Sequence, residues 1–129
     1  MKLKRVVVTG LGALTPIGNN VQEYWEALIN GVSGAAPIQQ FDASKFKTQF
    51  ACEVKNYDPN NHFDRKEHRK LDLFAQYALV AADQAVVDSG MDIEKVNFDR
   101  IGVIWGAGIG GLKTFQDECI AFGLSLIHI

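Results

Sequence analysis

The sequence lacks several features that would place it in a specialised class of protein. Its apolar runs are short, and none approaches the roughly 18 residues of a membrane-spanning helix. The N-terminus turns polar after Val6–Val8 and has neither the apolar stretch of about 7–15 residues nor the cleavage site of a signal peptide. Two cysteines, Cys52 and Cys119, are too few for a disulfide framework. These absences predict a soluble, cytoplasmic protein with reduced thiols and no membrane partner.

Positive charge is not in excess either. The 129 residues include 13 basic and 15 acidic side chains, which gives a net charge of −2. A protein that binds nucleic acid by neutralising phosphates is usually basic, so that class is excluded. The length corresponds to about one domain, and the composition, 47% hydrophobic and 22% charged, is that of an ordinary globular protein.

Short apolar runs predict the strands. Residues 5–9 and 100–105 are rich in valine and isoleucine, and glycine follows soon after each run. Such runs are typical of strands buried on both faces, as in a parallel sheet. Alternation over residues 50–54 predicts one short edge strand within an otherwise irregular region, residues 33–65.

Capping signals and apolar periodicity predict the helices. Asn20, with Glu23 three residues later, indicates a helix start, and Gly31 indicates its end. An apolar stripe over residues 65–89 predicts the longest helix, and a further helical stretch is predicted from residue 112 to about 122. Strands that alternate with helices indicate an α/β fold. Two or three strands make a thin sheet, so the chain resembles part of a larger fold.

A glycine-rich loop follows the second predicted strand. Gly106, Gly108 and Gly111 match the G-x-G-x-x-G pattern that binds dinucleotide phosphates between a strand and a helix. The acidic ribose ligand expected about 20 residues later is missing, because the chain stops at Ile129. Two interpretations stay open: a nucleotide-binding α/β module that uses Gly106–Gly111, or glycines that serve a tight turn and close packing.

A cluster of cations stands at the start of the longest predicted helix. Lys66, Arg69 and Lys70 lie there together with Arg65. Cations at a helix N-terminus oppose the helix dipole, and like charges four residues apart project together. On a chain of net negative charge this cluster predicts a positive patch for an acidic partner. The alternative is a charged helix end in water.

Three stretches, taken together, resemble the beta-ketoacyl-[acyl-carrier-protein] synthases, in particular synthase II. They are RVVVTGLGALTPIG at 5–18, RKEHRKLDLFAQY at 65–77 and RIGVIWGAGIGG at 100–111. Their order and spacing fit over residues 3–118. The resemblance implies that residues 1–123 are the N-terminal portion of the N-terminal domain of such a synthase. Residues 124–129 do not match and are expected to be a tail from a truncated or misjoined reading frame.

The resemblance also implies a fold and a reaction. The fold would be a thiolase-like layered α/β fold with mostly parallel sheets, of which this chain holds only the first part of the N-terminal half. The enzyme would be an acyltransferase of fatty acid biosynthesis, homodimeric and without a cofactor. It would take an acyl chain from acyl carrier protein onto a cysteine and elongate it by decarboxylative Claisen condensation with malonyl carrier protein.

No catalytic residue of that family maps onto this sequence. The nucleophile of the family lies in a later Thr-Ala-Cys motif, which neither Cys52 nor Cys119 matches. The three histidines, His62, His68 and His128, do not correspond to the family's catalytic pair, and they lack metal-ligand spacing with the cysteines. The isolated chain is therefore expected to be inactive and poorly folded.

Two binding features do carry over by resemblance. Lys66, Arg69 and Lys70 match positions that contact the acidic recognition helix of acyl carrier protein. Ile109 matches the isoleucine that gates the acyl pocket near the dimer interface. A third interpretation follows from the first feature: a carrier-protein-binding piece without catalysis.

Overall fold

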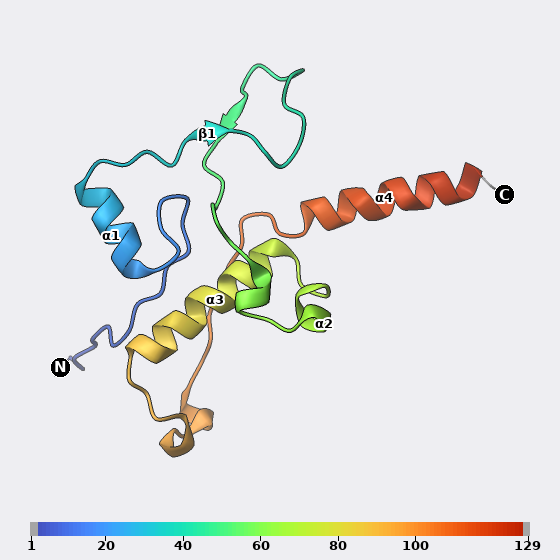
Figure 1. Ribbon diagram of the computed structural model, residues 1–129. Helices are drawn as coiled ribbons and strands as arrows, with labels where there is room; N and C mark the ends of the chain where they lie inside the picture. Colours follow the sequence, from blue (N-terminus) through green and yellow to red (C-terminus); the bar gives the residue numbers. More distant parts are fainter. Residues whose placement is uncertain (1–2, 128–129) are drawn as a thin grey trace. The chain divides into compact units, whose positions relative to one another are not determined.

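The computed structural model describes residues 3–127, which form helices joined by irregular segments and one short pair of strands (Figure 1). The elements are α1 Val21–Ile29, β1 Ala36–Pro37, β2 Phe50–Ala51, η1 Pro59–Asn61, α2 Arg65–His68, α3 Leu73–Asp88, η2 Ile93–Lys95, η3 Phe98–Arg100 and α4 Leu112–Ile127. They belong to two compact units. One contains residues 3–58 and 80–96, and the other contains residues 59–79 and 97–127.

Helix α1 begins and ends where the sequence predicts. The Asn20 side chain accepts a hydrogen bond from the backbone N–H of Glu23 at 2.9 Å, and the Glu23 carboxylate accepts one from the N–H of Asn19 at 2.8 Å. These bonds satisfy N–H groups that have no partner within the helix. At the other end Gly31 has φ of +64°, which glycine adopts without strain, so the chain turns away from the helix axis.

The loop before α1 is held against the second half of α3 by side chains of that helix. The N–H of Leu11 donates to the Asp88 carboxylate at 2.8 Å. The Gln84 amide bridges two points of the loop, because its oxygen accepts from the N–H of Ala13 at 3.0 Å and its nitrogen donates to the carbonyl of Asn19 at 2.8 Å. Polar side chains of a helix thus satisfy the backbone of an irregular segment.

Two glycines allow this loop to approach α3 closely. A Cβ atom added at Gly12 would overlap the carbonyl of Ala81 and lie 2.9 Å from the backbone nitrogen of Ala85. A Cβ at Gly10 would overlap the carbonyl of Ala85. Glycine is therefore required at both positions because the backbones touch, and the alanines of α3 leave room for that contact.

The two main strands that the sequence predicts are absent from the structure. Residues 5–9 and 101–105 have no regular secondary structure, and Val6 and Ile104 are 90% and 98% exposed. A strand exists only where a neighbouring strand satisfies its N–H and C=O groups. Among residues 3–127 the only sheet is the two-stranded pair of β1 and β2. The prediction of a buried parallel sheet within this chain is therefore wrong.

The short edge strand predicted at residues 50–54 is confirmed in a shorter form, because β2 covers only Phe50 and Ala51. It pairs antiparallel with β1, with Ala36 opposite Ala51. In the loop that joins them, the N–H of Ser44 donates to the Asp42 carboxylate at 3.0 Å. This bond holds the pKa of Asp42 below its ordinary value.

Little apolar surface is buried. Within the described residues, the hydrophobic side chains that are buried are Ala27, Ala43 and Val80. The accessible area is 11212 Å², against about 8,200 Å² for two compact bodies of half the chain's mass each. Helices α1, α3 and α4 therefore keep large apolar side chains exposed to solvent. No helix in the described part of the chain is long and apolar enough to cross a membrane.

Candidate functional site

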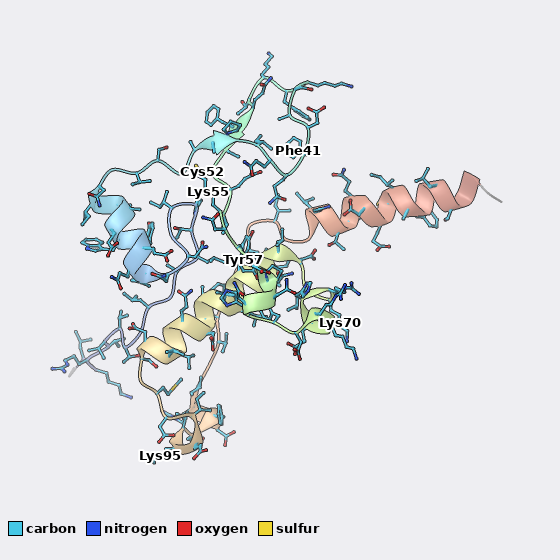
Figure 2. The ribbon with its side chains drawn as sticks, viewed as in Figure 1. Phe41, Cys52, Lys55, Tyr57, Lys70 and Lys95 are labelled. Carbon is cyan, nitrogen blue, oxygen red and sulfur yellow. The ribbon has the colours of Figure 1, made fainter. Side chains whose placement is uncertain are left out.

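The predicted cationic cluster lies on a short, exposed segment of the second unit. Lys66 is in α2, and Arg69 and Lys70 are in the turn that follows it (Lys70 is labelled in Figure 2). All three side chains are exposed. Among residues 3–127, no carboxylate lies within ion-pair distance of any of the three. We call residues 65–70 the basic segment, and its charge is available to a partner.

The single long helix predicted over residues 65–89 is two helices, so that prediction is wrong in one respect. The chain leaves α2 after His68 and begins α3 at Leu73. The carbonyl of Asp72 starts the new helix by accepting from the N–H groups of Ala75 and Gln76, each at 3.0 Å. Arg69 and Lys70 therefore lie in the turn between α2 and α3, and not in the first turns of one long helix.

A buried glutamine holds the break between the two helices. The Gln76 side chain is 5% exposed. Its amide nitrogen donates to the carbonyl of His68 at 3.0 Å and to the carbonyl of Leu71 at 2.8 Å. Both acceptors belong to the turn that carries Arg69 and Lys70. The turn is thus hydrogen-bonded to the first part of α3.

A shallow hollow borders the basic segment. It is lined by Phe63, Glu67, Lys70, Leu71 and Leu79. Three of the five lining residues are apolar, and Lys70 of the basic segment is one of the other two. A partner that pairs with the cations could also place an apolar side chain in this hollow.

The glycine-rich loop and Ile109 lie before α4 in the same unit. The Ile109 side chain is 76% exposed. The next residue, Gly110, packs against the Phe74 ring, because a Cβ there would lie 2.7 Å from the ring. Gly111 has φ of +70° and directs the chain into α4. Gly110 thus serves close packing and Gly111 a turn, whereas a Cβ at Gly106 or Gly108 would meet open space. The acyl-pocket role of Ile109 stays a prediction.

A carboxylate lies at the start of α4, which argues against a phosphate there. The Thr114 hydroxyl donates to the Asp72 carboxylate. The other Asp72 oxygen lies 3.1 Å from the position of a Cβ at Gly111. A nucleotide phosphate needs the positive end of the helix dipole and no competing anion. Asp72 therefore disfavours the nucleotide-binding alternative for Gly106–Gly111.

Sequence reasoning missed the two residues that organise this region, Gln76 and Asp72. The sequence features that could have pointed to these two residues are weak. Gln76 is a polar residue within an apolar stretch, residues 73–80, and Asp72 is an acidic residue directly before a helix. Each pattern has many explanations, and only the structure shows which carbonyls and hydroxyls they reach.

The residues considered for chemistry do not form a catalytic group. Cys52 follows β2 (Figure 2) and Cys119 lies in α4, and both thiols are free and exposed. Among residues 3–127, no three histidine, cysteine, aspartate or glutamate side chains could hold a metal ion together. His128 and the end of the proposed tail lie outside the described residues.

Comparison with known proteins matches nearly the whole chain to one family. Residues 3–121 match the family model described as the beta-ketoacyl synthase N-terminal domain. The chain is 48% identical over 118 residues to a 3-oxoacyl-[acyl-carrier-protein] synthase 2 of Synechocystis and 50% identical over 116 residues to one of Coxiella burnetii. These alignments cover 92% and 90% of this chain but only 28% of each relative.

Solved structures give the same result at the level of fold. The ishigamide ketosynthase/chain length factor is similar over 70% of this chain and 23% of its own, with a TM-score of 0.61 and 36% identity. A type II polyketide ketosynthase, AntDE, solved in complex with its acyl carrier protein AntF, is similar over the same shares, with a TM-score of 0.54 and 30% identity.

Proposed function

Since the chain belongs to the beta-ketoacyl synthase family, through the N-terminal domain of that family, we propose that it forms the N-terminal part of a 3-oxoacyl-[acyl-carrier-protein] synthase. The observation that carries this proposal is the identity of 48–50% to two such synthases over about nine-tenths of the chain. Residues 1–123 are the part of the enzyme that we assign to the N-terminal domain, and residues 124–129 are a tail outside it. The complete fold is the thiolase-like layered fold, in which later strands pair with residues 5–9 and 100–105.

The proposed reaction is the elongation of an acyl chain in fatty acid biosynthesis. The acyl group moves from its carrier thioester to a cysteine thiolate, and the carrier thiol is released. Malonyl carrier protein then loses CO₂, and the resulting carbanion attacks the acyl-enzyme carbonyl, forms the new carbon–carbon bond and frees the cysteine. The thiolate and the histidines of this reaction come from outside residues 1–129. The complete enzyme is a homodimer.

The part that residues 1–129 contribute is the docking of acyl carrier protein. Lys66, Arg69 and Lys70 are exposed and unpaired by carboxylates within the described residues, so they offer three positive charges to an acidic surface. The hollow beside Lys70 supplies adjacent apolar contact. The related polyketide ketosynthase that was solved with its acyl carrier protein supports a partner of this class.

Charge reversal in the complete enzyme tests this docking role. The triple variant Lys66→Glu, Arg69→Glu and Lys70→Glu is expected to raise the KM for malonyl carrier protein about 10-fold or more, because three favourable pairs become repulsive. Its kcat at saturating carrier protein should change little. Steady-state kinetics at low and high salt measure the effect, which screening should reduce at high ionic strength.

A matched variant controls for net charge. Lys45→Glu, Lys47→Glu and Lys55→Glu change the same number of exposed lysine or arginine charges outside the basic segment. The control should leave the KM for carrier protein within about 2-fold of wild type, since it leaves the basic segment intact. Equal KM values for the two triple variants would refute a docking role for the basic segment.

A further inference from the structure

The position of Gln76 relative to the basic segment has a consequence for partner binding. Gln76 is in α3 and does not reach the surface, with 5% of its area exposed. The two carbonyls that it holds, those of His68 and Leu71, are the backbone groups on either side of Arg69 and Lys70. One buried amide therefore fixes both ends of the turn that carries two of the three docking cations.

The turn has two backbone hydrogen bonds of its own, from the N–H of Lys70 to the carbonyl of Glu67 at 2.9 Å and from the N–H of Leu71 to the carbonyl of His68 at 3.3 Å. Helix α2 has only four residues, and so short a helix does not hold its own shape in water. The backbone bond to His68 is long, and the Gln76 amide adds a shorter one at 3.0 Å together with its bond to the carbonyl of Leu71 at 2.8 Å. An apolar side chain of similar length at that position would supply neither bond.

We propose that Gln76 is a positioning residue for carrier-protein docking: it fixes the backbone from His68 to Leu71 so that Arg69 and Lys70 present their charges as one surface. This inference rests on the proposed function, because it takes the basic segment as the docking surface. It makes the preorganisation of the turn, and not only its charge, a determinant of affinity.

The test compares two glutamines of the same helix in the complete enzyme. Gln76→Met removes the donors and keeps the length of the side chain, and it should raise the KM for malonyl carrier protein about 10-fold. The kcat at saturating carrier protein, and turnover of a carrier-free thioester with the same acyl group, should stay within about 2-fold. Gln84→Met removes an equivalent bridge, to Ala13 and Asn19, and should leave the KM unchanged.

The outcomes separate the inference from the proposed function. A KM for Gln76→Met no higher than that for Gln84→Met, while the triple charge reversal raises it, overturns the role of Gln76 alone. No effect of the charge reversal overturns the proposed function and the inference with it. If Gln76→Met does not fold, Gln76→Asn replaces it, since the shortened amide cannot reach both carbonyls. An unchanged KM in that variant equally overturns the inference.

Discussion

Single residues in this chain have roles that their chemistry alone does not reveal. Gln76 and Gln84 are the same residue type in the same helix. Gln76 is hydrogen-bonded to the backbone of the basic segment and the turn after it, whereas Gln84 is hydrogen-bonded to the backbone of the loop before α1. Asp72 is an acidic residue between two helices, and its carboxylate lies at the start of α4. The sequence shows which residues are polar, whereas the identity of their partners depends on how the backbone folds.

The acyl-pocket role of Ile109 is testable at this scale. Ile109→Phe in the complete enzyme is expected to shorten the longest acyl chain that is accepted, because a larger side chain fills the space that the pocket offers. Turnover of a series of acyl carrier proteins of increasing chain length measures the limit. Ile120→Phe, an equal change at an exposed position in α4, is the control. An unchanged chain-length preference in Ile109→Phe would remove that residue from the pocket.

Elements defined by local signals were predictable, and elements defined by distant partners were not. Helix α1 follows from Asn20, Glu23 and Gly31, which lie within or next to it. The strands at residues 5–9 and 100–105 were predicted from composition, but a strand also needs a neighbour, and none is present among residues 3–127. The break after α2 was missed because it depends on side-chain bonds from Gln76.

The close packing of the loop before α1 on α3 predicts that an added methyl group has opposite effects on stability at Gly12 and at Gly123. In the complete enzyme, Gly12→Ala is expected to lower the free energy of unfolding by about 1–3 kcal/mol, because the added methyl group overlaps the carbonyl of Ala81. Gly123→Ala, where a Cβ meets open space within α4, should instead stabilise helix by up to about 1 kcal/mol. Circular dichroism during thermal unfolding compares them. Shifts of the same sign in both variants would contradict the close contact at Gly12.

At the scale of the whole molecule, apolar exposure is the dominant feature. The chain spans 28% of the length of the two curated relatives, and many of its large hydrophobic side chains are in solvent. Ile104 and Val103 are 98% and 86% exposed although their sequence is typical of a buried strand. We propose that other parts of the complete synthase cover these residues.

Ile104→Asn tests whether residues that are exposed in this chain are buried in the complete enzyme. In the complete enzyme it should lower stability by about 2–5 kcal/mol, because it removes a buried side chain and places an amide in an apolar sheet. In the 129-residue chain, where Ile104 is 98% exposed, the same change should leave the helix content unchanged. Denaturant unfolding of the complete enzyme and circular dichroism of the 129-residue chain measure the two effects. A small effect in the complete enzyme would mean that residues 100–105 are not part of its buried sheet.

The most direct test of the account is to locate the acyl group on the enzyme. The complete synthase is incubated with acyl carrier protein loaded with an acyl chain, without malonyl carrier protein, and its peptides are analysed by mass spectrometry. We expect the acyl mass on a cysteine outside residues 1–129 and none on Cys52 or Cys119. An acyl group on Cys52 or Cys119 that is then converted to a 3-oxoacyl product would contradict the assignment of these residues to a docking part of the enzyme.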